Sequence, residues 1–347
     1  MIITRTPFRI SFAGGGSDLP KFYLRERGAV VSVTIDKYMY IMLRENFARN
    51  QILLKYSKTE LVDDPAALAH PIFRQLLSDY GLNGLEIALS ADVPAGTGLA
   101  SSSALTVGLH QNLGILLGRF TTKEDLARLA CNTELNELNW PIGKQDQYAA
   151  AYGGLNFIEF HSDERVTVEN LYINRFKRAR LEESLLLIYT GLCSHSAEDL
   201  LRKVSAGIDE EKNFRQIADL VVLARRLRDE LVTSCDPTVI GEIMHEGWMK
   251  KRELTSGVTN DTIDAVYRLG LKHGAVGGKL LGAGGAGFIL FACAPGQRER
   301  LLGALSQFQN LPFRFEMQGS SVVYVSDDAV RNRAGSARNH ELRVLYG

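Results

Sequence analysis

The stretch "PAGTGLASSSALTVG" (residues 94–108) places two glycines and three consecutive serines directly before an apolar segment. Leucines recur at helical spacing beyond residue 104, which predicts a helix that begins near the serines. Small residues let a backbone approach a ligand closely, and the N–H groups at a helix start attract anions. No G-K-[ST] follows the glycines, so this is not a Walker A loop. Two interpretations are open: a phosphate-binding loop, or an ordinary loop with Ser101 or Ser102 as helix N-cap.

The composition is typical of a globular protein. The chain has 347 residues, of which 45% are hydrophobic and 23% charged, and Lys+Arg and Asp+Glu both total 40. Because no net charge recruits nucleic acid or a membrane surface, we expect neither partner. The four cysteines form no C-x-x-C pair, and neither a secretory signal nor an 18-residue apolar run is found. We therefore expect a cytoplasmic protein.

The pattern along the chain mixes strands and helices. Residues 1–13 read as a strand, and residues 28–45 read as paired strands with a break at Asp36–Lys37. From about residue 194 to 273 the pattern is mostly helical. A boundary near residue 185 therefore predicts an N-terminal domain over 1–185 and a C-terminal domain over 186–347.

Three glycine-rich segments lie far apart in the chain, at 14–16, 96–100 and 282–287. A dinucleotide-binding protein would have one such loop, with G-x-G-x-x-G spacing, directly after a strand. The first segment lacks that spacing, which argues against a Rossmann fold.

The glycine segments belong to three motifs: "PFRISFAGGGSD" (7–18), "PAGTGLASSSA" (94–104) and "KLLGAGGAGF" (279–288). In this order they resemble the signature motifs of the GHMP kinases, the family of galactokinase, homoserine kinase and mevalonate kinase. Ala100 replaces a frequent glycine, and Ser103 stands where alanine is common. The resemblance implies an α+β fold of two domains, one like ribosomal protein S5 domain 2 and one ferredoxin-like, with the active site between them.

The resemblance also implies ATP as phosphoryl donor and Mg²⁺ as cofactor. The ATP phosphates would be bound by the second motif, at Pro94, Gly96, Gly98, Leu99, Ala100, Ser101, Ser102 and Ser103. In related kinases a serine of this loop and a later glutamate bind the metal, which here implies Ser102 and Glu134. A hydroxyl and a carboxylate suit Mg²⁺ because it prefers oxygen ligands and keeps several waters. From the residues alone, a solvated helix face is the favoured interpretation of Glu134.

The catalytic residues implied by the resemblance are Asp146, which would accept the proton of the attacking hydroxyl, and Arg9, which would steady the developing charge. A lone aspartate in a loop is usually a turn residue, so Asp18 and Asp146 each have that second interpretation. The implied substrate contacts are Asp18, Gly15, Gly16, Ser17, Gly284 and Gly285.

Within the family, "AGGGSD" and "YTGLCSHSAEDLL" look most like bacterial D-glycero-D-manno-heptose 7-phosphate kinases, followed by fucose kinases. We therefore expect a sugar phosphate and ATP as ligands, with a homodimer as one option for assembly. Other sugar 1-kinases, mevalonate-type kinases and a non-catalytic relative that only binds sugar and ATP are the alternatives. No spacing rule decides which basic residue would hold a 7-phosphate; the candidates are Lys21, Arg25, Lys144, His195, Arg202 and Lys203. The arginines of the C-terminal tail are expected on a solvated surface or in a packed terminal segment.

Overall fold

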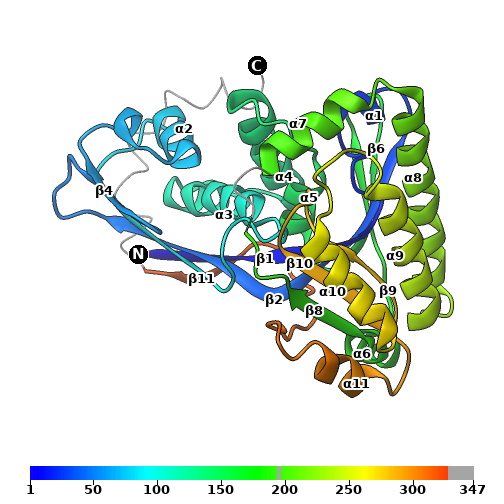
Figure 1. Cartoon of the computed structure of the whole chain (residues 1–347). Coiled ribbons are helices and arrows are strands. Elements are labelled where there is room, and N and C mark those ends of the chain that lie inside the picture. Colours follow the sequence, from blue (N-terminus) through cyan, green and yellow to red (C-terminus); the bar gives the residue numbers. More distant parts are fainter. Residues whose placement is uncertain (194–196, 327–347) are drawn as a thin grey trace.

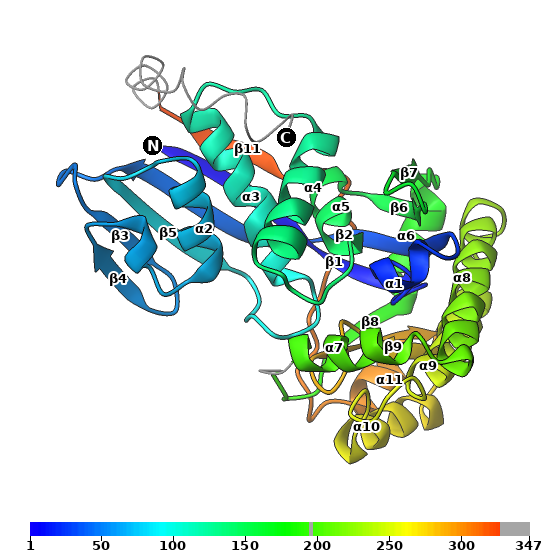
Figure 2. The same cartoon turned by 90° about the horizontal axis from the view of Figure 1, so that it is seen from above.

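The computed structural model describes residues 1–193 and 197–326. These residues form an eight-stranded sheet and a three-stranded sheet with helices packed on both (Figure 1). Figure 2 shows the second sheet and its helices at one side of the molecule, away from β3 (Ile52–Lys55), β4 (Thr59–Val62) and α2 (Pro71–Asp79). No helix of the described residues is both long and apolar enough to cross a membrane.

The first sheet has the order β11-β1-β2-β5-β3-β4, and β6 joins it at β2 and carries β7. The strands are β1 (Ile2–Ala13), β2 (Gly28–Glu45), β3 (Ile52–Lys55), β4 (Thr59–Val62), β5 (Leu85–Ala91), β6 (Leu155–Phe160), β7 (Val166–Asn170) and β11 (Ser321–Val325). Every pair is antiparallel except β3 and β5.

The predicted break at Asp36–Lys37 is wrong, because one 18-residue strand, β2, runs through both residues. The strand changes partner there: residues 28–33 pair with β6, and residues 39–45 pair with β5. Since β1 lies along the other edge of β2 on both sides of this point, both halves of the strand stay hydrogen-bonded.

Helices that carry site residues lie over the first sheet. α3 (Ser101–Leu116) packs on β1 and β2 and contacts α4 (Lys123–Cys131) and α5 (Gln145–Tyr152). A π-helical segment, Asn132–Glu137, directly continues α4. α8 (Glu211–Val232) also contacts β1 and β2, so its apolar side chains join the same core. Further helices are α1 (Pro20–Tyr23), the 3₁₀ turn Pro65–Ala67, α6 (Arg175–Ser184) and α7 (Ala197–Gly207).

The second sheet has the order β8-β10-β9, formed by β8 (Leu185–Tyr189), β10 (Phe288–Cys293) and β9 (Ala275–Leu280). It is covered by α9 (Pro237–Lys251), α10 (Asp261–Lys272) and α11 (Arg298–Ala304). Residues 309–311 bond to β8 through Gln309 O and the Leu311 N–H without forming a longer strand. The order strand, helices, two strands, helix and short edge segment is the ferredoxin-like arrangement that the resemblance implies.

The last described strand, β11, leaves the second sheet and pairs with β1 of the first. The first sheet therefore draws its strands from both ends of the chain. The division into two domains at residue 185, where β8 begins, stays a prediction. That division does not anticipate that β11, from the C-terminal part of the chain, pairs with the first sheet.

Candidate active site

The loop before α3 places the start of this helix at a cavity. No serine side chain caps the helix. Ala100 is the N-cap residue in a left-handed conformation (φ 63°), and no side chain caps the helix. The N-cap interpretation of Ser101 and Ser102 is therefore wrong. The first helical hydrogen bond runs from the Ala104 N–H to the Ala100 carbonyl (3.0 Å). The N–H groups of residues 101–103 precede it, as an anion-binding helix start requires.

The cavity measures about 250 Å³ and lies between the two sheets' layers. It is lined by most of the predicted residues, namely Arg9, Gly15, Gly16, Asp18, Gly96, Gly98, Ala100, Ser101, Ser102, Ser103 and Asp146. Pro94 and Leu99 do not line it. Leu99 is buried, and its carbonyl accepts the Arg9 N–H (3.2 Å), so it anchors the loop to β1.

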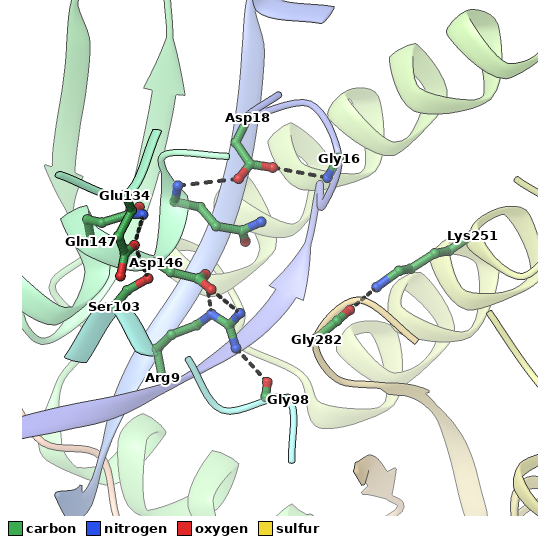
Figure 3. A network of polar contacts seen from close by, with 11 residues as sticks. Arg9, Gly16, Asp18, Gly98, Ser103, Glu134, Asp146, Gln147, Lys251 and Gly282 are labelled. Atoms are coloured by element: carbon green, nitrogen blue, oxygen red, sulfur yellow. Dashed lines mark hydrogen bonds and ion pairs between the residues drawn. The ribbon is translucent and has the colours of Figure 1, made fainter. Parts of the chain in front are cut away.

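Arg9 on β1 joins the loop to the start of α5 (Figure 3). Its Nε and Nη2 donate to the two carboxylate oxygens of Asp146 (2.7 and 2.8 Å), and its Nη1 donates to the Gly98 carbonyl (2.8 Å). Arg9 is 4% exposed, whereas the Asp146 side chain keeps 25% of its surface exposed. A bidentate fork of this kind fixes the carboxylate in one orientation at the cavity wall.

Asp18 faces the same cavity from the glycine turn after β1. Its carboxylate accepts the N–H groups of Gly16 (3.1 Å) and Gln145 (3.3 Å). Burial and the nearby charge of Asp146 raise the pKa of Asp18. Gly143 makes this approach possible, since a Cβ there would lie 1.8 Å from Asp18 Oδ2.

Three predicted substrate contacts do not line the cavity. Ser17 is fully buried, and its hydroxyl donates to the carbonyls of Gly14 (2.8 Å) and Ala29 (3.1 Å), so it stabilises the turn. Gly284 and Gly285 pack against Val258 rather than lining the cavity. From the third motif the cavity receives Lys279, Gly282 and Ala283 instead.

Glu134 lies in the π-helical segment, an irregularity that is frequent at functional sites. It is fully buried, and its carboxylate accepts hydrogen bonds from the hydroxyls of Thr106 (2.6 Å) and Ser103 (2.8 Å) and from the Gln147 amide (2.5 Å). Ser102 Oγ lies 3.4 Å from its Oε1. The solvated-face interpretation is therefore wrong. Burial raises the pKa of Glu134 to about 7.

The chemistry of Ser102 and Glu134 fits a bound Mg²⁺. Ser102 lines the cavity, and the buried carboxylate behind it has hydroxyl and amide donors but no ion pair with any described side chain. A cation beside Ser102 would supply the missing positive charge, and both groups present oxygen atoms. In the described part of the chain no cluster of three or more acidic, histidine or cysteine side chains offers an alternative metal site.

Two lysines that the sequence reasoning missed line the cavity. Lys251, at the end of α9, donates to the Gly282 carbonyl (2.5 Å), and burial lowers its pKa to about 8. Lys279, in β9, is 6% exposed, and burial lowers its pKa as well. A lysine is usually a surface residue, so only the position of Lys279 within the third motif could have drawn attention to it.

The basic residues considered for a substrate phosphate lie elsewhere. Lys21 pairs with Asp209 (2.7 Å), Lys144 with Glu164, and the Arg25 guanidinium stacks 3.9 Å over the Phe214 ring. Arg202 and Lys203 are exposed on α7. His195 and the C-terminal arginines (Arg331, Arg333, Arg338 and Arg343) are outside the described residues.

Comparison with known proteins matches two stretches of the chain to one family. Residues 67–154 match the GHMP kinases N terminal domain, and residues 230–309 match the GHMP kinases C terminal domain. The chain is 29% identical to the D-glycero-alpha-D-manno-heptose 7-phosphate kinase of Campylobacter jejuni, over 92% of this chain and 97% of that protein. It is 28% identical to the bifunctional fucokinase/GDP-fucose pyrophosphorylase of Arabidopsis thaliana, over 85% of this chain and 30% of that protein.

A solved structure of a D-glycero-D-manno-heptose 1-phosphate kinase from Bacteriodes thetaiotaomicron superposes with a TM-score of 0.75 at 25% identity, covering 94% of this chain and all of that one. A mevalonate kinase structure shares the fold, with a TM-score of 0.69 at 18% identity over 91% of this chain and 99% of that one. The chain therefore belongs to the GHMP kinase family and is an ATP-dependent phosphotransferase.

Proposed function

We propose that this kinase transfers the γ-phosphoryl group of ATP to the C1 hydroxyl of D-glycero-D-manno-heptose 7-phosphate and yields the 1,7-bisphosphate. Two relatives that match nearly the whole chain are kinases of heptose or its phosphates by name, and this similarity supports the substrate class. The product would feed nucleotide-activated heptose and surface polysaccharide synthesis. The reaction would take place in the cytoplasm, where ATP is available.

The observation that carries the proposal is the Arg9 fork. Arg9 binds both carboxylate oxygens of Asp146, and its remaining nitrogen binds the carbonyl of Gly98 in the phosphate loop. One side chain therefore fixes the position of the proposed base, Asp146, relative to that loop. Proximity and orientation of this kind account for much of the catalysis of phosphoryl transfer.

Each residue then has a role. Asp18 accepts hydrogen bonds from sugar hydroxyls and orients the ring, and Asp146 accepts the proton of the C1 hydroxyl. The N–H groups at the start of α3 bind the ATP phosphates. Ser102 and Glu134 would hold Mg²⁺, which when bound neutralises phosphate charge.

The test is an ADP-release assay over a panel of heptose 7-phosphate, free heptose, fucose, galactose and mevalonate. A charge-assisted contact to the 7-phosphate contributes about 1.5–3 kcal/mol, so heptose 7-phosphate should exceed free heptose by roughly ten- to a hundredfold in kcat/KM. Equal efficiency on the two heptoses would overturn the phosphorylated substrate.

A free-sugar 1-kinase is the second candidate, because fucokinases are among the relatives. In that case fucose would be the preferred substrate of the panel. ATP binding without ADP release on any sugar would instead indicate a non-catalytic relative.

A further inference from the structure

We propose that Lys251 and Lys279 form a cationic site that holds the phosphoryl group while it passes from ATP to the sugar. This role rests on the proposed kinase reaction, and it adds two catalytic residues to those that the motifs imply.

Arg9 is the cation expected for this task, but three of its five N–H groups are already engaged, which leaves two for a phosphoryl group. Nε and Nη2 bind Asp146, and Nη1 binds the Gly98 carbonyl. A phosphoryl group has three oxygens that need donors during transfer. Among the residues that the structure describes, the remaining cationic side chains that line the cavity are Lys251 and Lys279.

Lys251 approaches the reacting groups from the second layer of the molecule. Figure 3 shows its side chain extending from α9 toward Gly282, on the opposite side of the cavity from Asp18 and Asp146. Its ammonium donates to the Gly282 carbonyl, and the charges of Asp18, Asp146 and Arg9 all act on it. An ammonium has three donors, so two stay available after the bond to Gly282.

Lys279 is the stronger sign of an anionic ligand. Its side chain is 94% buried and lines the cavity, yet no described residue accepts a hydrogen bond from its amine. Its charged neighbours are two other cations, Lys251 and Arg9. A buried ammonium among like charges is unfavourable, so such a group loses its proton more easily unless an anion joins it.

The position next to the phosphate loop favours the transferred group over other anions. The backbones of Gly98 and Gly282 touch, since a Cβ on Gly282 would lie 2.6 Å from the Gly98 Cα. The Gly282 carbonyl, which accepts the hydrogen bond of Lys251, therefore lies next to the phosphate loop, whose Gly98 carbonyl accepts the hydrogen bond of Arg9. Both lysines thus line the cavity that the loop, Asp146 and Asp18 also line, with Arg9 as a charged neighbour of each.

The chemistry at this point is a balanced transfer. The bond between the γ-phosphorus and the β–γ bridging oxygen breaks, and its electron pair leaves with ADP. A bond from the γ-phosphorus to the sugar oxygen forms, and the hydroxyl proton goes to Asp146. The lysines donate hydrogen bonds to the phosphoryl oxygens throughout and undergo no covalent change.

A phosphate already present on the sugar is the other source of an anion, and substrate comparison separates the two. Lys279→Met and Lys251→Met are assayed on heptose 7-phosphate and on free heptose. Lys250→Met is the matched control, because Lys250 is the neighbour of Lys251 on α9 and pairs with Asp219 at the surface (2.8 Å). Methionine keeps the length of the side chain and removes the charge.

The proposal predicts that each cavity variant lowers kcat about ten- to a hundredfold and by the same factor on both sugars, while Lys250→Met behaves as wild type. It also predicts that Lys279→Met raises the Tm of the ligand-free protein, since an unpaired buried amine is removed. A lysine with a structural role would give the opposite shift.

Three results would overturn the proposal. A loss confined to heptose 7-phosphate would assign the lysines to the phosphate of the substrate. Unchanged kcat would remove them from the reaction, and a lowered Tm or failure of Lys279→Met to fold would make them structural. If wild type rejects heptose 7-phosphate, the proposed substrate fails, and the variants are compared on the sugar that wild type accepts.

Discussion

Asp146 and Asp18 face one cavity from different surroundings, and their substitution should separate catalysis from sugar binding. Asp146 is held by the Arg9 fork, whereas Asp18 is held by two backbone N–H groups. The first arrangement leaves a carboxylate poised as a base, and the second leaves one that can accept sugar hydroxyls.

Asp146→Asn should lower kcat by about 10²–10⁴, the usual contribution of a positioned general base. The interaction strengthens as the hydroxyl loses its proton, so KM should change little and ATP affinity should persist. Steady-state kinetics and nucleotide titration measure both. Asp18→Asn is the control and should mainly raise the KM for the sugar; near-normal kcat in Asp146→Asn would make Asp146 a turn residue.

Gly143→Ala should act on Asp18 without touching its chemistry. The added Cβ would overlap Asp18 Oδ2, which lies 1.8 Å from that position, so the carboxylate must move. We expect a KM for the sugar raised at least as much as in Asp18→Asn, with the ATP KM near wild type. An unchanged sugar KM would show that the Asp18 position does not matter for binding.

At the scale of the element, the π-helical segment brings Glu134 behind the phosphate loop. The segment widens the helix by one residue at the end of α4, and the carboxylate reaches three hydroxyls of α3. This buried acid should make both stability and metal binding depend on pH.

The metal-free protein should lose stability as pH rises. The pKa of Glu134 is raised from 4.5 to about 7, so the folded state binds more protons than the unfolded state between these values. The free energy of unfolding contributed by this group therefore falls from pH 4.5 to about 7. Denaturant unfolding of wild type and Glu134→Gln at both ends of the range measures the difference. An identical pH profile in the two proteins would contradict it.

The Mg²⁺ concentration that the activity requires should also depend on Glu134. Glu134→Gln should raise the Mg²⁺ concentration needed for activity, because a neutral amide is a poorer ligand environment for a hard cation. The measurement is a Mg²⁺ titration of kcat at saturating ATP. An unchanged titration with full activity would exclude Glu134 from metal binding.

Local features of the site could be predicted from the sequence, whereas features made by distant packing could not. The loop and the helix start at residues 94–103 could be predicted, because small residues there precede leucines at helical spacing. Burial of Ser17 depends on its contacts with Ala29 of β2, and the cavity position of Lys251 depends on α9 lying against the loop. The break expected at Asp36–Lys37 failed because neighbouring strands support β2 on both sides.

At the scale of the molecule, the two layers meet at a glycine pair. Gly98 of the phosphate loop and Gly282 of the third motif are in backbone contact, and both have positive φ. No other residue type leaves room for the two backbones to come this close. The distance between the phosphate loop and the two cavity lysines, Lys251 and Lys279, therefore depends on this glycine contact.

Gly282→Ala should lower the free energy of unfolding by about 1–3 kcal/mol, the usual cost of overpacking, and should also raise the KM for ATP. Gly303→Ala on α11 is the control, since a Cβ there meets nothing within 4 Å. It should stabilise the protein by about 0.5–1 kcal/mol with unchanged kinetics. Wild-type stability and kinetics in Gly282→Ala would show that the contact does not set the geometry of the site.

The central claim is transfer of phosphate from ATP to C1 of a sugar that already carries one phosphate. The most direct measurement is ³¹P NMR of the product after incubation with ATP, Mg²⁺ and heptose 7-phosphate. We expect a new phosphate signal coupled to the anomeric proton, with the 7-phosphate signal retained and one ADP formed per product. Phosphorylation at another position, or no consumption of ATP with this sugar, would contradict it.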